Sequence, residues 1–404
     1  MGIGESFLEL CGRVGNLTKQ KTGISIVDAY FGPEELRPEL QDTQPVDELI
    51  AELNKLNDVI NDEITDNIRR DFLVGEIASL RTVVDWLTGG DIPYSKLVSE
   101  LFHIDIQHFS ERDIDEAQAN LDRLLPGDES QTLKERVYLY EEKGKVSGAE
   151  LRQLIEGELQ EKATEVGNLF KERVFSLMGD DVTDNGVTYK PVKDEPWSGY
   201  NYYQGDFKSI NAFNTDRSFN RHNLLGVIYH EYEHHVSGLW REKAFHEKGW
   251  TELSIVPLHT GRCVISEGTA DTAREFLEIK ESETEELVRA LYKLRRMTSI
   301  NAAVMLNEKG TPKDEVIEYL IERGLRKPKS AKGSIQFIHP EKEDGTPNIW
   351  APYVFTYYFG RNNFVFPTFQ RAKEEDEMKR FFRTLYLNPF SGSSVTWKEA
   401  YNWL

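Results

Sequence analysis

The sequence predicts a mostly helical protein of the α+β class, with two lobes and one small antiparallel sheet. Two observations predict this class. Apolar residues recur at helical spacing over most of the chain, and strand signals are confined to residues 179–214. A chain of 404 residues is long enough for two domains or one large two-lobed unit. We therefore expect an N-terminal helical lobe over residues 1–178 and a second lobe over residues 179–404.

The N-terminal lobe shows helical patterns interrupted by Gly and Pro. Ser147 and Glu150 have the spacing of a capping box, which predicts a helix that begins there and continues to about Met178. The segment DAYFGPEEL, near the start, is punctuated by Gly and Pro and predicts irregular structure. A further helix is expected after Pro93. The other helices expected in this lobe span residues 5–20, 46–89, 111–125 and 129–144.

The second lobe begins with the strand signals. Residues 184–192 and 199–213 combine turn dipeptides with alternating aromatic and β-branched side chains, which favours strands and hairpins. Helical patterns then resume and continue to the end of the chain. The helices expected there span residues 224–240, 265–279, 281–307, 311–324, 351–364 and 374–387.

Composition excludes several classes of protein. The chain has 69 acidic and 49 basic residues, a formal net charge of −20, so the phosphate backbone of a nucleic acid would be repelled. Its two cysteines, Cys11 and Cys263, provide neither a disulfide framework nor a thiolate zinc cluster. No secretory signal and no apolar run of about 18 residues is visible, so we expect no membrane span and a cytoplasmic location.

The stretch HEYEHH begins at His230 and concentrates the chemistry of the chain. His230 and His234 are four residues apart, so on a helix they lie on one face and can bind the same ion. Glu231 lies beside them, near enough to accept a proton from a water on that ion. This is the logic of the HExxH motif, in which a metal activates water and a glutamate acts as the general base.

A third metal ligand is expected from the segment ISEGTADTA. Glu267 and Asp271 are also four residues apart on a predicted helix. If Glu267 binds the metal, Asp271 can hydrogen-bond a ligand histidine and fix its orientation. Small residues after Glu267 would let the two helices approach closely. His246 and His259 are weaker candidates, because neither has such a helical partner. His235 adjoins His234 on the helix and points about 100° away from it.

HEYEH followed by EGTAD resembles the gluzincin zinc metallopeptidases, whose pattern is HExxH and then ExxxD on a later helix. The resemblance implies a zincin-like second lobe. It also implies that His230, His234 and Glu267 bind one zinc ion, with Glu231 as the general base and Asp271 behind a ligand. The gap of 32 residues between His234 and Glu267 is longer than in thermolysin-like enzymes. It is more typical of the mostly helical gluzincins, such as the oligopeptidases and the carboxypeptidase Taq-like group.

DAYFGPEEL and the EHH sequence also resemble a related, uncharacterised bacterial family of peptidase-like proteins. In that family a Pro-Gly pair is inserted before the final two histidines, and this chain lacks it.

Gluzincins also present an edge strand to their substrate and, in helical members, a tyrosine to the oxyanion. The resemblance assigns the strand to GDFKSINAF, with Asn211 and Ala212 binding the peptide backbone. Three tyrosines of the YVFTYYFGR segment qualify for the second role, and Tyr357 is favoured because Gly360 and Arg361 follow one turn later. Arg361 would bind a substrate carboxylate. Each of these assignments has a structural alternative. The strand could be a hairpin without a substrate role, the tyrosines could belong to the aromatic core, and Arg361 could be a surface residue.

The function expected from these residues is hydrolysis of short peptides by a zinc-dependent metallopeptidase, either a carboxypeptidase or an oligopeptidase. Cobalt or manganese would also suit two histidines and a glutamate. Two alternatives remain open. The first is a catalytically inactive metal-binding protein, and the second is a helical interaction protein that retains the motif by accident. Glu231 argues against a purely structural metal site, which needs four ligands and no base.

Overall fold

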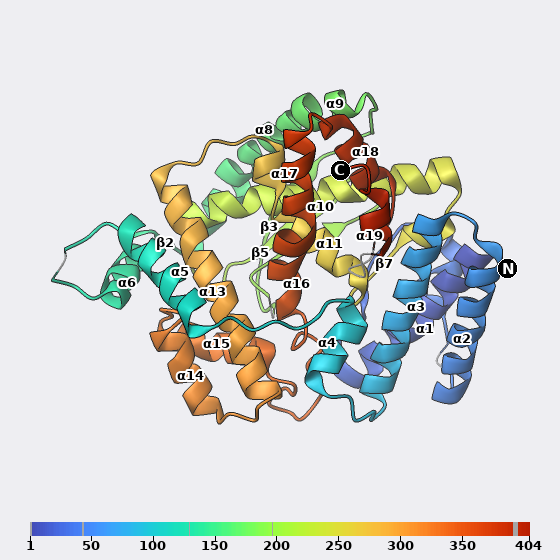
Figure 1. Cartoon of the computed structure of the whole chain (residues 1–404), viewed down its shortest axis with the longest axis horizontal. Coiled ribbons are helices and arrows are strands. Elements are labelled where there is room, and N and C mark those ends of the chain that lie inside the picture. The colour runs from blue at the N-terminus through green and yellow to red at the C-terminus, as the bar shows by residue number, and fades with distance from the viewer. Residues whose placement is uncertain (1, 43, 129, 196, 391–394) are drawn as a thin grey trace.

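A computed structural model describes the whole chain except residues 1, 43, 129, 196 and 391–394 (Figure 1). Helices dominate it, which confirms the predicted fold class. The helices up to the HEYEHH segment are α1 (Ile3–Thr22), α2 (Val46–Glu63), α3 (Asn67–Leu87), α4 (Tyr94–Phe102), α5 (Glu111–Leu124), α6 (Leu133–Lys143), α7 (Gly148–Leu154), α8 (Gln160–Phe170), α9 (Ser176–Met178) and α10 (Arg221–Lys248). The later helices are α11 (Gly261–Ala270), α12 (Ala273–Phe276), α13 (Glu283–Asn307), α14 (Lys313–Glu322), α15 (Pro328–Ile338), α16 (Val354–Phe359), α17 (Phe366–Glu374), α18 (Met378–Leu387) and α19 (Val395–Ala400).

Short helical segments of other types link these helices. Three are 3-10 helices, η1 (Glu34–Leu36), η2 (Pro38–Leu40) and η5 (Thr251–Ser254). Three are π-helical turns, η3 (Ile155–Leu159), η4 (Lys171–Phe175) and η6 (Gly360–Val365). Through η3 and η4, the helix predicted over residues 147–178 is continuous from Gly148 to Met178. Its predicted capping box is not formed, because the Ser147 side chain makes no cap hydrogen bond.

The strands are β1 (Val27–Tyr30), β2 (Lys145–Val146), β3 (Val187–Val192), β4 (Gly199–Tyr203), β5 (Ser209–Asn214), β6 (Phe219–Asn220) and β7 (Ile255–Pro257). A three-stranded sheet with the order β3-β5-β4 lies just before α10, where the sequence predicts a sheet. Its β4 and β5 are antiparallel, while β3 and β5 are parallel. The other pairings, β1 with β7 and β2 with β6, are antiparallel. The strand β1 overlaps the start of the DAYFGPEEL segment, where the sequence predicted irregular structure.

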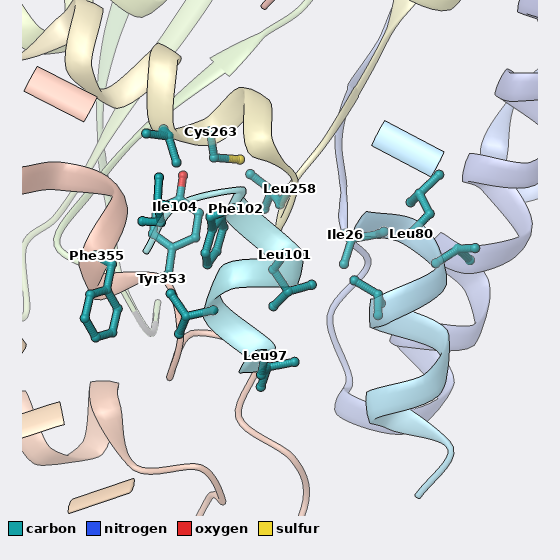
Figure 2. Close-up of a cluster of buried hydrophobic side chains, with 14 of the residues drawn as sticks. Ile26, Leu80, Leu97, Leu101, Phe102, Ile104, Leu258, Cys263, Tyr353 and Phe355 are labelled. Carbon is teal, nitrogen blue, oxygen red and sulfur yellow. The ribbon is translucent and has the colours of Figure 1, made fainter. Parts of the chain in front are cut away.

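The hydrophobic cores do not divide at the expected boundary between residues 178 and 179. One large cluster combines side chains of α1–α4 with residues 255–359, which come from the second half of the chain. Figure 2 shows part of it, with Phe102 and Leu101 of α4 beside Leu258, Cys263 and Tyr353. A second cluster combines side chains between residues 146 and 277 with those of the C-terminal helices. Segments far apart in sequence therefore share each core, since both halves contribute one wall to each.

Two glycines let α11 lie directly against the C-terminal helices. A Cβ on Gly268 would lie 2.3 Å from the carbonyl carbon of Gly360, and a Cβ on Gly360 would lie 1.9 Å from the carbonyl oxygen of Val264. The two backbones therefore touch at this crossing. The sequence had suggested that small residues after Glu267 bring α11 close to α10, but Gly268 serves contact with η6.

In the described ranges, no helix combines the length and the apolarity needed to cross a lipid bilayer.

Candidate metal centre

Two helices carry the histidines and the glutamate of the predicted site. The 28-residue helix α10 begins after Asn220, whose side chain accepts hydrogen bonds from the backbone N–H groups of His222 and Asn223. The helix α11 packs against it, and both lie near the centre of the molecule in Figure 1. The chain between them passes through η5 and β7, and β7 pairs with β1. This pairing ties the loop between the two helices to the N-terminal segment.

His230, His234 and Glu267 converge on one point, as the sequence predicted. His230 Nε2 lies 3.1 Å from His234 Nε2 and 3.4 Å from Glu267 Oε2, and His234 Nε2 lies 3.9 Å from the same oxygen. Ligands placed about 2.0–2.1 Å from a zinc ion at tetrahedral angles lie about 3.3 Å apart. In the described residues this is the group of His, Cys, Asp and Glu side chains that could hold a metal. The three spacings therefore fit a metal of zinc's size.

Contacts behind the ligands fix their orientation. His230 Nδ1 lies 2.9 Å from Asp271 Oδ1, so an N–H on Nδ1 donates to the carboxylate and leaves Nε2 free as a ligand. Asp271 is in turn held by Arg296 of α13, which donates to both of its oxygens. His234 Nδ1 lies 3.4 Å from the hydroxyl of Ser266. Both imidazoles thus point the same nitrogen at the common point.

Glu267 carries an atom that is hard to explain without a bound cation. Its Oε1 accepts a hydrogen bond from the Tyr353 hydroxyl at 3.0 Å, whereas its Oε2 is buried and has no hydrogen-bond partner in the described residues. Figure 2 shows the Tyr353 ring among buried apolar side chains, with its hydroxyl directed toward α11. A buried carboxylate oxygen without a partner costs free energy. A metal ion bound by the two histidines would satisfy it.

The electrostatics of this point also favour a positive charge. Burial lowers the pKa of His230, but the hydrogen bond to Asp271 and the negative charges of Asp271 and Glu267 outweigh burial and raise it well above its ordinary value. The pKa of His234 falls to about 4, because burial and the charge of His230 act together. Two carboxylates thus stabilise one cationic charge between them, which suits a metal ion as well as a proton.

Glu231 is placed next to this centre, in the wall of a cavity. The cavity has a volume of about 280 Å³ and is also lined by His230, His234 and Glu267. The Glu231 side chain is almost fully buried, and burial raises its pKa to about 7, partly opposed by the charge of His230. Its backbone carbonyl accepts a 3.4 Å hydrogen bond from Asn201 of β4. A carboxylate with this pKa accepts and returns protons readily near neutral pH.

The substrate strand predicted at Asn211 and Ala212 is not an edge strand. Both residues belong to β5, which pairs with β3 on one side and β4 on the other. Their backbone groups are engaged by the sheet, so the edge assignment is wrong. The edge that faces the cavity is β4, which contributes Tyr200 and Asn201 to its wall. The sequence suggested an edge because β5 follows β4 in a hairpin. In the fold, the other side of β5 pairs in parallel with β3, which comes earlier in the chain.

The three candidate tyrosines are separated by the structure. Tyr357 lines the cavity, and its hydroxyl makes no hydrogen bond in the described part of the chain. Tyr353 also lines the cavity but donates to Glu267. Tyr358 packs against Phe109 with ring centroids 4.8 Å apart, outside the cavity wall. The choice of Tyr357 therefore agrees with its position, and its catalytic role stays a prediction.

Arg361 lies away from the cavity. Its guanidinium forms an ion pair with Glu275, lies 3.4 Å from the Thr272 hydroxyl and stacks 4.1 Å from the Phe366 ring centroid. In a regular helix Arg361 would share a face with Tyr357, four residues earlier. The π-helical turn η6 intervenes, and the wider turn directs Arg361 toward α12. The structure thus gives it a saturated structural environment.

Several residues of the site were missed from the sequence. Arg296 supports Asp271, Ser266 contacts His234, and Arg262 of α11 lines the cavity. Asp28 of the DAYFGPEEL segment also lines it and is hydrogen-bonded by the Tyr200 hydroxyl. Two of these carried a signal, because Asp28 and Ser266 lie in the segments DAYFGPEEL and ISEGTADTA that the sequence analysis had already singled out.

No protein-family model matches this chain, and no curated protein matches its sequence. Among the solved structures that resemble it are two lipoprotein structures. The crystal structure of the putative lipoprotein from Colwellia psychrerythraea has a TM-score of 0.55 and 14% sequence identity, over 96% of this chain and 69% of that chain. The structure of a putative lipoprotein of unknown function from Shewanella oneidensis has a TM-score of 0.48 and 10% identity, over 88% of this chain and 72% of that chain. The chain therefore shares its mostly helical fold with the Colwellia protein.

Proposed function

We propose that this protein is a zinc-dependent metallopeptidase that hydrolyses short peptides. The observation that carries the proposal is the convergence of His230, His234 and the unpartnered Oε2 of Glu267 at the wall of a cavity. A structural zinc site is closed by four protein ligands, whereas a catalytic one has three and leaves a position for water or substrate. Three ligands beside a cavity, with a glutamate next to them, match the catalytic pattern.

The residues of the chain divide the work of hydrolysis between them. When bound, zinc supplies a Lewis acid that polarises a carbonyl and makes a water nucleophilic at neutral pH. Glu231 accepts the proton of the attacking water and returns it to the leaving amine. Tyr357 donates its free hydroxyl to the oxygen on which negative charge develops. Asp271 and Arg296 hold the His230 ring in place throughout.

The cavity supports short peptides as the substrate class. Its walls come from α10, α11, the N-terminal β1 segment and residues 385–390, so the metal point is surrounded on several sides. The strand β4 has a hydrogen-bonded neighbour on one side only within the described sheet, and its free edge can pair with an extended peptide backbone. A cavity of about 280 Å³ holds a few residues in extended form and excludes a folded protein.

The test compares Glu231→Gln with His230→Ala on the full chain, using zinc content and hydrolysis of a pool of quenched short peptides. We expect Glu231→Gln to keep one zinc per chain and to lose turnover by at least about 100-fold, as removal of a general base does. His230→Ala should lose both zinc and turnover. The matched controls are Glu247→Gln and His246→Ala, at the far, exposed end of α10, which should keep both properties.

Other outcomes would decide between the alternatives. Stoichiometric zinc without hydrolysis of any peptide would favour a catalytically inactive metal-binding protein. A purified chain that binds no added zinc would leave only a helical interaction protein that retains the motif.

A further inference from the structure

Arg262 is a cation in the cavity wall whose hydrogen-bond donors are unused. It is the second residue of α11, and it lines the same cavity as the metal centre. Its guanidinium makes neither a hydrogen bond nor an ion pair within 4.0 Å anywhere in the described chain, and its Nε is buried. The two terminal nitrogens are also without partners but are not among the buried atoms, so they are reachable from the cavity.

The other arginines near the site are saturated. Arg296 donates to both oxygens of Asp271, and Arg361 is paired with Glu275. Arg241 lines the cavity too, but it donates to the backbone carbonyls of Leu253 and Ile255. Three of these four guanidinium groups thus have structural partners. Arg262 differs, because the groups that would satisfy it are not supplied by the surrounding protein.

Nearby carboxyl groups do not use these donors either. Asp28 and Glu76 lie close enough for their charges to act on Arg262, yet neither forms an ion pair with it. Asp28 accepts a hydrogen bond from the Tyr200 hydroxyl. Glu76 is fully buried. An arginine in a largely buried position with five donors and no acceptor favours an anionic ligand, best a planar carboxylate that accepts two parallel hydrogen bonds.

The position of Arg262 sets the distance between such a carboxylate and the reacting bond. Arg262 lies four residues before Ser266, whose hydroxyl contacts His234. Four residues span about 6 Å along a helix, and an extended peptide spans about 3.3–3.6 Å per residue. A rise of about 6 Å along the helix corresponds to one or two residues of an extended substrate.

We propose that Arg262 binds the C-terminal carboxylate of the peptide substrate, and that the enzyme removes one or two residues from that end. This inference rests on the proposed peptidase function and assigns its substrate class. The carboxylate recognition that the sequence assigned to Arg361 is thereby transferred to Arg262. A side-chain carboxylate near the end of a peptide has the same chemistry, and the experiment below separates the two sources.

The test measures binding rather than turnover. Zinc-loaded Glu231→Gln is titrated calorimetrically with N-acetyl-trialanine, with its C-terminal amide, and with the amide of N-acetyl-dialanyl-glutamate. We expect the free acid to bind about 10- to 100-fold more tightly than its amide, the range that a charge-assisted pair of hydrogen bonds gives. The glutamate-containing amide should bind like the plain amide. If it binds like the free acid, the ligand is a side-chain carboxylate and the C-terminal assignment is overturned.

Two double variants connect this preference to Arg262. In Glu231→Gln with Arg262→Gln, the acid and the amide should bind equally, with zinc content unchanged. Glu231→Gln with Arg262→Lys keeps the charge and should retain part of the preference, which covers the case in which the glutamine variant fails to fold. Glu231→Gln with Arg361→Gln is the matched control and should keep the full preference.

Equal binding of acid and amide while Arg262 is intact would overturn the inference, as would an undiminished preference in both Arg262 variants. These outcomes are separable from failure of the proposed function. A wild-type chain that binds zinc and hydrolyses internal bonds of amidated peptides would remain a metallopeptidase and would refute only the role of Arg262.

Discussion

His234 and His235 are neighbours on α10, but the fold surrounds them with opposite kinds of environment. His235 is fully buried, and both of its ring nitrogens are engaged. Its Nδ1 lies 2.9 Å from the Ser209 hydroxyl and its Nε2 lies 3.0 Å from Asp184. His234 presents its Nε2 to His230 and Glu267 at the cavity wall. Protein groups thus occupy both ring nitrogens of His235, whereas the Nε2 of His234 stays available at the cavity wall.

The comparison teaches that the contacts around a side chain, and not its residue type, decide which groups are left available at the cavity. Ser209, His235 and Asp184 even have the contacts of a Ser-His-Asp triad, yet none of them lines the cavity. They attach β5 and the segment before β3 to α10. Consecutive helical residues point about 100° apart, which is enough to send His235 into the sheet while His234 faces the metal point.

The largest expected effect contrasts these two histidines directly. His234→Ala removes one of three ligands, so we expect zinc affinity to fall by more than about 1,000-fold with the fold retained. His235→Ala leaves Asp184 with less compensation in a buried place, so we expect intact zinc stoichiometry and a loss of about 2–4 kcal/mol in the free energy of unfolding. Zinc titration and urea denaturation measure the two effects. Loss of zinc in a folded His235→Ala variant would contradict the comparison.

A smaller effect is expected at the tyrosines of the C-terminal region. Tyr357 has a free hydroxyl at the cavity, so Tyr357→Phe should lower kcat by about 100- to 1,000-fold while KM changes little, as loss of an oxyanion donor does. Tyr358→Phe is the matched control, because its ring packs against Phe109 outside the cavity. Steady-state kinetics on one quenched peptide decide the matter. Equal losses in both variants would indicate a packing role.

The next effect concerns the support behind the metal ligands. Arg296→Gln removes the partner that holds Asp271, so we expect zinc affinity to fall by about 10- to 100-fold, as for other groups that orient a ligand. Asp271→Asn should act in the same direction. Arg289→Gln, on the same helix and paired with Glu281 at the surface, should leave zinc affinity unchanged. Competition with a chelator of known affinity measures all three.

The smallest effect is on stability and depends on pH. Glu76 is fully buried, neither of its oxygens makes a hydrogen bond in the described residues, and burial raises its pKa to about 7. Because its pKa is higher in the folded state, Glu76 stabilises the fold below pH 4.5 and loses that contribution as pH rises to about 7. Glu76→Gln should therefore gain Tm relative to wild type over this range, by a few degrees at most in a chain of this size.

Glu252 provides the contrasting case for that measurement. It is equally buried but is bound by two guanidinium nitrogens of Arg69, at 2.6 and 3.0 Å. Glu252→Gln should lower Tm at neutral pH, because it leaves Arg69 without its partner. A pH-independent effect of Glu76→Gln would show that its carboxyl is satisfied in a way the fold does not reveal.

Local spacing accounts for the parts of the site that were predicted from the sequence. His230 with His234, and Glu267 with Asp271, are pairs four residues apart, and helical geometry places such pairs on one face without any knowledge of the tertiary structure. The predictions for Arg361 and for the edge strand were wrong because local spacing did not decide where these residues lie. A π-helical turn altered the spacing after Tyr357, and a parallel partner, β3, covered the strand that carries Asn211 and Ala212.

The sequence by itself determined the mostly helical class and the position of the small sheet, and it singled out His230, Glu231, His234 and Glu267 as the candidate site, since all of these follow from periodicity and short-range spacing. Only the tertiary structure decided that Arg296 stands behind Asp271, that both halves of the chain share each core, and that Arg262 rather than Arg361 faces the cavity. The physical reason is that burial and side-chain pairing depend on segments that are far apart in the sequence. A local pattern does not specify which of these segments will contact one another in the fold.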